Sequence, residues 1–174
     1  MNNKCVFLDR DGVLNEDRTD YVYRVEDMII PAGVAEGLQQ LKNAGYLLIV
    51  ITNQAGIAKG LYSRADVMKC FDYLQQQCGN VLDDIYFCPH HPAYTSNSLL
   101  RKPESLMLEK AMAKYNINPA MSWMIGDCPR DIEAGQRVGV RTVHITDENA
   151  NQPPVADGRA ADLLAASRLV LQTI

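Results

Sequence analysis

The chain has 174 residues, 47% of them hydrophobic and 22% charged, with a formal net charge of −4, and we expect a single globular domain over residues 1–174. The acidic balance argues against a general nucleic-acid-binding surface. The longest aliphatic run, Leu47 to Ile51, is far too short to cross a membrane.

Short apolar runs alternate with amphipathic helical patterns along the chain. Five runs are predicted to be strands: 5–9, 46–52, 84–88, 122–127 and 140–145. Helical spacing of apolar residues predicts four helices between them: 32–45, 63–79, 103–115 and one through Ile132 and Val138. The polar segment 146–158 is predicted to be a surface connection, and 160–174 is either all helix or a short strand followed by a helix.

Three helix ends carry recognisable local signals. Gly45 suits a C-terminal cap, and Ser63 with Asp66 is a weaker relative of the capping box. Pro103 is predicted to begin the third helix, since proline is favoured at the first helical position.

Strands that alternate with helices predict right-handed crossovers and a mostly parallel sheet that is covered on both faces. The expected fold is therefore an α/β, Rossmann-like three-layer sandwich. In such sheets, ligands bind beyond the carboxyl ends of the strands, where the strand order reverses.

Polar residues follow four of the five predicted strands and are expected to meet at one edge of the sheet. They are Asp9 and Asp11; Thr52, Asn53 and Gln54; Arg101 and Lys102; and Asp127 with Asp131. Crowded carboxylates need a cation, and oxygen ligands without a nearby imidazole favour Mg²⁺. A hydroxyl, an amide and two cations at the same edge favour a phosphate. The pattern therefore predicts magnesium-assisted phosphoryl chemistry.

The two aspartates after the first strand suit two different roles in such chemistry. An aspartate beside Mg²⁺ can attack phosphorus and form an aspartyl-phosphate, and a second acid can protonate the leaving oxygen and later activate water. Strand alternation would place Asp9 and Asp11 on one side and Arg10 on the other. Gly12 lets the chain turn away directly afterwards.

Each of these signals has an ordinary structural explanation when it stands alone. An Asp-x-Asp at a strand end is often a turn, and "GDCPRD" (126–131) could be only a charged helix N-terminus. An EF-hand loop is excluded because Gly12 is the fourth residue from Asp9, whereas that loop needs glycine at the sixth. The signals in order, each after a strand, favour the catalytic interpretation.

Four segments together resemble the motifs of the haloacid dehalogenase (HAD) superfamily of phosphatases: "FLDRDGVLN", "VITNQ", "RKPE" and "MIGDCPRD". The resemblance covers about residues 4–145 and implies a HAD-like fold. It implies that Asp9 is the nucleophile, that Asp11 is the general acid/base, and that Thr52 and Lys102 bind the transferring phosphoryl group. It also implies that Mg²⁺ is held by Asp9, the backbone carbonyl of Asp11, and Asp127.

Longer segments, "DRDGVLNED", "TNQAGIAKG" and "RKPESLML", resemble the small capless branch of histidinol-phosphatases and heptose-1,7-bisphosphate 7-phosphatases. The short connections leave no room for a cap domain. The likeness to the heptose enzymes implies a phosphorylated sugar as substrate, with heptose 1,7-bisphosphate converted to the 1-phosphate for lipopolysaccharide core synthesis. It implies substrate contacts from a flap at 17–20 and from six further residues: Arg10, Thr52, Asn53, Gln54, Arg101 and Lys102.

Many members of this branch hold a structural zinc through C-x-H and a later C-x-C, and this chain lacks the second pair. Cys88, His90 and His91 are present in "CPHH", but no cysteine follows before Arg101. A closed zinc site needs four ligands, so no structural zinc is expected. The two histidines are then expected to shape the loop, face the substrate, or make ordinary hydrogen bonds.

Three alternatives remain open. A histidinol-phosphatase, or another small-molecule phosphatase of the branch, would use the same residues. A phospho-accepting receiver domain also uses Mg²⁺, aspartate, threonine and lysine, but it would carry an aspartate after the third strand, where this chain has "FCPHH". A nucleic-acid 3′-phosphatase of the same superfamily is disfavoured by the lack of a basic stripe.

The five cysteines are scattered without a disulfide framework, and the first residues lack the apolar segment of a signal peptide. We therefore expect a monomer in the reducing cytoplasm that acts on a small phosphorylated sugar, without nucleic-acid or membrane partners.

Overall fold

The computed structural model describes residues 3–146 and 155–173 and contains one six-stranded sheet. Its strand order is β3-β2-β1-β4-β5-β6, and every neighbouring pair is parallel. The strands are β1 (Cys5–Leu8), β2 (Leu47–Asn53), β3 (Asp84–Cys88), β4 (Trp123–Gly126), β5 (Arg141–Ile145) and β6 (Gly158–Ala160). Within the described ranges, no helix is long and apolar enough to cross a lipid bilayer.

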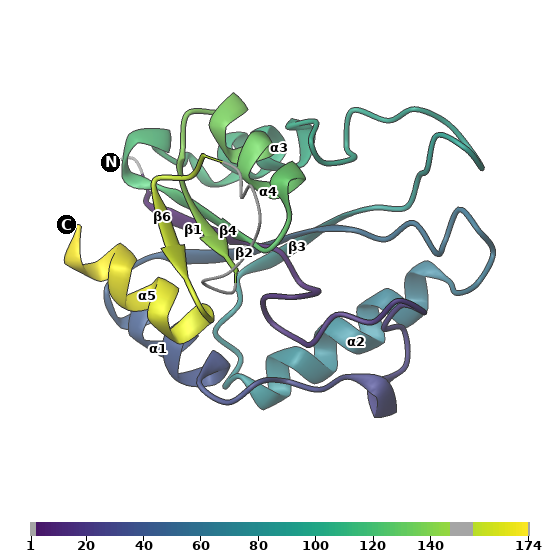
Figure 1. Ribbon diagram of the computed structural model, residues 1–174, viewed down its shortest axis with the longest axis horizontal. Helices are drawn as coiled ribbons and strands as arrows, with labels where there is room; N and C mark the ends of the chain where they lie inside the picture. The colour runs from purple at the N-terminus through teal and green to yellow at the C-terminus, as the bar shows by residue number, and fades with distance from the viewer. Residues whose placement is uncertain (1–2, 147–154, 174) are drawn as a thin grey trace.

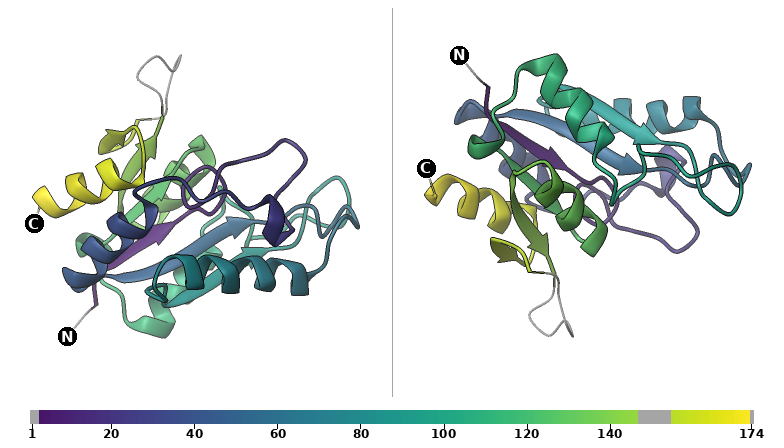
Figure 2. Two further views of the ribbon diagram at one scale, coloured as in Figure 1. Left: turned by 90° about the horizontal axis from the view of Figure 1, so that it is seen from below. Right: turned by 90° about the horizontal axis from the view of Figure 1, so that it is seen from above.

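Helices cover both faces of the sheet, as Figures 1 and 2 show. One face packs against α1 (Val34–Asn43), α2 (Arg64–Gln77) and α5 (Leu163–Gln172), and the other against α3 (Leu106–Tyr115) and α4 (Pro129–Arg137). Alternate residues of β1 enter the two cores: Val6 and Leu8 the first, Cys5 and Phe7 the second. A strand buried on both sides must be apolar throughout, which explains the short apolar runs. The predicted three-layer α/β fold is confirmed.

Of the three helix ends predicted from local signals, two are confirmed and one is wrong. Asp66 N–H donates to Ser63 Oγ, and Ser63 N–H donates to Asp66 Oδ2, so α2 begins with a complete capping box. Gly45 follows α1 with a φ of 82°. Pro103 does not begin α3; it lies in a preceding turn closed by a hydrogen bond from Glu104 N–H to the Arg101 carbonyl.

The last part of the chain forms a short strand followed by a helix, which is the second of the two predicted alternatives. The short strand β6 pairs with β5, and Asp162 then caps α5 by accepting a hydrogen bond from Ala165 N–H. Of the predicted connection 146–158, residues 147–154 lie outside the described residues.

The strand order reverses between β1 and β4. The chain leaves β1 to build β2 and β3 on one side, then returns to build β4, β5 and β6 on the other. Asp9 follows β1 and Asp127 follows β4. Both carboxylates therefore lie where doubly wound sheets bind their ligands.

Candidate active site

A cleft of about 250 Å³ opens beside the carboxyl ends of β1 and β2. Its lining residues are Asp9, Asp11, Asp17, Arg18, Thr19, Tyr21, Thr52, Asn53 and Arg130. Asp9 is only 4% exposed and Thr52 only 1%, and we call these two the floor of the cleft. Residues 17–19 and Arg130 are exposed and form its mouth. A ligand that reacts at the floor must therefore extend toward the mouth.

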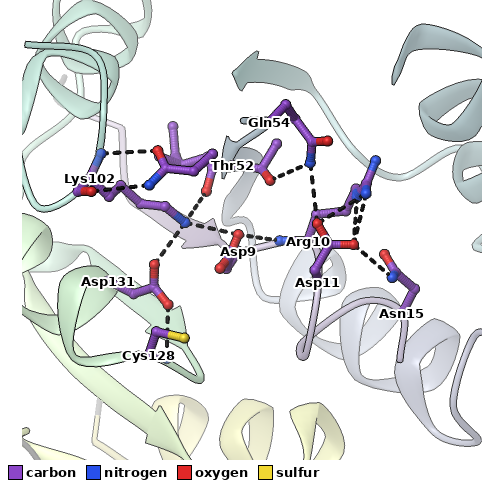
Figure 3. Close-up of polar contacts among 11 residues, drawn as sticks. Asp9, Arg10, Asp11, Asn15, Thr52, Gln54, Lys102, Cys128 and Asp131 are labelled. Atoms are coloured by element: carbon purple, nitrogen blue, oxygen red, sulfur yellow. Dashed lines mark hydrogen bonds and ion pairs between the residues drawn. The ribbon is translucent and has the colours of Figure 1, made fainter. Parts of the chain in front are cut away.

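The ammonium group of Lys102 lies between two carboxylates (Figure 3). Its Nζ is 2.8 Å from Asp9 Oδ1 and 2.7 Å from Asp131 Oδ1, and it donates a hydrogen bond of 2.7 Å to the Ile51 carbonyl. Burial lowers the pKa of Lys102, but the charges of Asp131 and Asp9 outweigh this effect and raise it overall. Lys102 is therefore charged and neutralises part of the acid cluster.

Asn53 fixes the backbone of Lys102. The Asn53 amide donates to the Lys102 carbonyl and accepts from the Lys102 N–H, both at 3.0 Å. This pair of hydrogen bonds joins the end of β2 to the loop before α3. Asn53 still lines the cleft, but its side chain is already committed to positioning the lysine.

Asp9 and Asp127 both resist ionisation in this site. Burial and the charge of Asp131 raise the pKa of Asp9 to about 8, even though Lys102 lowers it. The same two causes raise the pKa of Asp127. Its Oδ1 atom is buried and has no hydrogen-bond partner among the residues that the structure describes. An added divalent cation would stabilise both charges, and a donor set made of oxygens suits Mg²⁺.

Gly12 allows the turn after β1 to approach Asp127 closely. Its φ is 81°, and a Cβ atom built at this position would lie 2.2 Å from Asp127 Oδ2. A side chain here would displace the carboxylate as well as strain the backbone.

Gly12→Ala is expected to weaken Mg²⁺ activation at least tenfold, with about 1–2 kcal/mol lost from backbone strain. The measurement is the Mg²⁺ concentration for half-maximal activity, together with the melting temperature. Gly60→Ala is the matched control, because Gly60 has a φ of 72° and a Cβ atom added there would meet no atom within 4 Å. If both variants need the same Mg²⁺ concentration for half-maximal activity, contact between the new Cβ atom and Asp127 does not explain the weaker Mg²⁺ activation.

Asp11 is held in place by three neighbours. The Arg10 guanidinium lies 2.8 Å from Asp11 Oδ1, while Asn15 Nδ2 and Gln54 Nε2 donate to its two oxygens at 3.0 and 3.2 Å. Arg10 is itself anchored by a 2.7 Å hydrogen bond to the Val22 carbonyl. The Asp11 carboxylate is thus fixed at the side of the cleft.

Four of the six residues expected to contact substrate are not among those that line the cleft, and their contact with substrate stays a prediction: Arg10, Gln54, Arg101 and Lys102. Arg10 is 1% exposed behind Asp11, and Gln54 is buried, donating to Thr52 Oγ1 and accepting from Tyr62 Oη. Arg101 and Lys102 both line a separate hollow of about 350 Å³. Gln54 donates to Asp11 and Thr52 and so positions both, and Arg10 positions Asp11, while Arg10 Nη1 is buried without a hydrogen-bond partner among the described residues.

The sequence pattern assigns no role to Asp131, Arg130 or His144, and the structure brings all three to the site. Asp131 pairs with Lys102, and Arg130 lines the cleft. His144, at the end of β5, places Nε2 2.8 Å from the Asp127 carbonyl oxygen. The fifth strand therefore also delivers a polar side chain. Of these three residues, Arg130 could have been noticed in the sequence, because the helix dipole disfavours a cation in the first turn of a helix.

The candidate zinc residues make local contacts. Cys88 is buried with its Sγ 3.8 Å from the His90 carbonyl oxygen, and His91 Nδ1 accepts a hydrogen bond from Ala93 N–H. Over 3–146 and 155–173, the one cluster of potential metal ligands is Asp127, Cys128 and Asp131. The expected lack of a structural zinc stays a prediction.

Comparison with known proteins agrees with this geometry. The family model described as HAD-hydrolase-like matches residues 99–171, which include Lys102, Asp127 and Asp131. The D-glycero-β-D-manno-heptose-1,7-bisphosphate 7-phosphatase of Haemophilus ducreyi is 41% identical over 150 residues, 82% of each chain. The D-glycero-α-D-manno-heptose-1,7-bisphosphate 7-phosphatase of Burkholderia mallei is 38% identical, over 90% of this chain and 87% of that one.

Solved structures give the same result. The D,D-heptose 1,7-bisphosphate phosphatase from B. bronchiseptica, complexed with magnesium and phosphate, superposes with a TM-score of 0.88. The two chains are 27% identical, and the match covers 98% of this chain and 99% of that one.

Proposed function

We propose, since the chain belongs to the haloacid dehalogenase superfamily of phosphatases, that it removes the 7-phosphate of D-glycero-D-manno-heptose 1,7-bisphosphate and releases the 1-phosphate. The observation that carries this proposal is the buried Asp9 at the floor of the cleft, where it pairs with Lys102. The similarity of the chain to the heptose enzymes supports the choice of substrate. The relatives include enzymes named for both anomers, so either anomer is a candidate substrate.

In the proposed reaction, a carboxylate oxygen of Asp9 attacks the phosphorus of the 7-phosphate. The bond between phosphorus and the sugar oxygen breaks, and the protonated Asp11 gives its proton to that oxygen. Ionised Asp11 then takes a proton from water as the water oxygen attacks the aspartyl-phosphate, which regenerates Asp9 and frees inorganic phosphate. Lys102 and Thr52 hold the phosphoryl oxygens during both steps.

The residues that would hold Mg²⁺ are Asp9, Asp127 and the backbone carbonyl of Asp11. The fit is supported by the unpartnered Asp127 Oδ1 and by the raised pKa values of both carboxyl groups. When bound, the ion would neutralise the acid cluster and part of the phosphate charge.

Steady, multiple-turnover release of phosphate from the heptose bisphosphate is expected in the presence of MgCl₂. Excess EDTA should abolish it, and added Mg²⁺ should restore it, because Asp9 must be ionised to act as a nucleophile. Phosphate release is measured colorimetrically over many enzyme equivalents. A single equivalent of bound phosphate, without turnover, would instead favour a receiver domain, and full activity in EDTA would contradict the metal assignment.

We also propose that the chain acts as one capless domain over residues 1–174, as a cytoplasmic monomer. The connections 9–33 and 89–105 lie wholly inside the described residues and contain, as regular structure, only the short 3-10 helix η1 (Val25–Asp27). These connections are where a cap would be inserted, and their brevity supports the capless part of the proposal.

A further inference from the structure

The mouth of the cleft contains two arginines in different electrostatic states. Arg18 is committed: it contacts both carboxylate oxygens of Asp20 at 3.0 Å and Asp27 Oδ1 at 3.1 Å. The side chain of Arg130 makes no hydrogen bond or ion pair with any residue that the structure describes. Arg130 is therefore the cleft-lining cation that is available to a ligand.

Arg130 also occupies a position that local stability does not favour. It is the second residue of α4, in the helical turn where the macrodipole is unfavourable to a positive charge. The same dipole adds to the positive potential that an anion would meet there. The charges of Asp131, Asp9 and Asp127 act on Arg130 without a direct ion pair. A cation placed against the dipole, beside a cleft and without a hydrogen bond or ion pair of its own, has the properties of a ligand-binding group.

The substrate of the proposed function carries two phosphates, and the site separates their positions by depth. The phosphate that reacts must contact Asp9 and Thr52 at the buried floor. The rest of the sugar must then extend to the mouth, because the floor is the buried end of the cleft and the mouth residues are exposed. The second phosphate is therefore expected among exposed residues.

Charge decides on which side of the mouth that phosphate lies. On the flap side, the guanidinium of Arg18 contacts the carboxylates of Asp20 and Asp27, and Asp17 accepts a hydrogen bond from the Arg18 backbone N–H. Three carboxylates against one guanidinium make this side negative overall. The side formed by α4 presents the unpaired Arg130. A dianionic phosphate is repelled by the first side and attracted by the second.

We propose that Arg130 binds the phosphate that the enzyme retains, and that it thereby selects a sugar bisphosphate over a sugar monophosphate. This inference rests on the proposed function and names the residue that sets its specificity. The acidic flap side then remains for the uncharged hydroxyl groups of the sugar, which carboxylates accept well as hydrogen-bond donors.

The test compares heptose 1,7-bisphosphate with heptose 7-phosphate, which lacks only the retained phosphate. Arg130→Met is expected to lower kcat/KM for the bisphosphate roughly ten- to hundredfold, the usual range for losing a hydrogen bond to a charged group. The loss should fall mainly on KM. On heptose 7-phosphate, kcat/KM should stay within about threefold of wild type, because that substrate never contacts Arg130. Arg130→Lys should recover part of the preference, since it keeps the charge.

Arg168→Met is the matched control, because Arg168 is an exposed arginine on α5 and its removal changes the net charge equally. Suppose that the wild-type enzyme is active and Arg130→Met is folded. If kcat/KM of the variant then falls equally on both substrates, or does not fall on the bisphosphate, the assignment of Arg130 is overturned while the proposed function stands. If wild-type enzyme releases phosphate from neither sugar, the proposed function itself fails and this inference fails with it.

Discussion

Asp9→Asn is expected to lower kcat for phosphate release by roughly 10⁴-fold or more, as removing a catalytic nucleophile does. Asparagine cannot form the aspartyl-phosphate, and the other two carboxylates that line the cleft, Asp11 and Asp17, are more exposed than Asp9. The fold should survive, because the asparagine carbonyl can still accept the hydrogen bond from Arg10 N–H and contact Lys102. Removing a charge that burial and Asp131 disfavour also relieves repulsion.

Single-turnover and steady-state kinetics with the heptose bisphosphate, together with a thermal melt, measure both effects. The melting temperature should stay within a few degrees of wild type. Asp72→Asn, at an exposed position of α2, is the matched control and should keep full activity. Activity of Asp9→Asn above about one per cent of wild type would refute Asp9 as the nucleophile.

Lys102→Met is expected to remove activity and also about 3–5 kcal/mol of stability, the range measured when one partner of a buried ion pair is deleted. Methionine matches the lysine in length, so the packing is largely kept. The carboxylates of Asp9 and Asp131, however, lose the ammonium group that lies between them. The free energy of unfolding, from chemical denaturation, is the quantity to measure.

The loss caused by Lys102→Met should grow with pH. Burial and Asp131 raise the pKa of Asp9 to about 8 while Lys102 is present, and removing the lysine raises it further. A carboxyl group whose pKa is higher in the folded state binds protons more readily there, so its contribution to stability falls as pH rises above the unfolded value. Asp9 is protonated in both folded proteins well below about pH 8, so the extra destabilisation should appear as pH rises from about 7 to about 9.

A double variant separates charge from packing. Adding Asp131→Asn to Lys102→Met removes one of the two uncompensated carboxylates, so part of the lost stability should return while activity stays absent. If the double variant is as unstable as the single one, lost packing rather than uncompensated charge explains the effect.

The strand ends and the floor of the site could be predicted because both depend on local sequence. An apolar run that stops at Asp9 or Thr52 places these residues at the carboxyl edge, whatever the surrounding loops do. The error at Pro103 has the same local origin: the residue suits a helix start, but the chain first completes a turn from Arg101 to Glu104. Propensity alone does not distinguish these two outcomes.

The orientation of Arg10 and Gln54 could not be predicted, because their partners come from loops whose paths local propensity does not determine. Arg10 reaches the Val22 carbonyl, and Gln54 accepts from the Tyr62 hydroxyl. The contact of His144 with the site could not be predicted for a similar reason. A lone histidine in an apolar run gives no sequence signal when its partner is a backbone carbonyl. Side-chain positions after a strand end depend on tertiary contacts.

The central claim is tested most directly by following the reaction of heptose 1,7-bisphosphate by ³¹P NMR, with both anomers and with histidinol phosphate measured in parallel. We predict that the 7-phosphate signal disappears, that the 1-phosphate remains, and that kcat/KM for one heptose anomer exceeds that for histidinol phosphate by at least about a hundredfold. Loss of the 1-phosphate, or a preference for histidinol phosphate, would contradict the account.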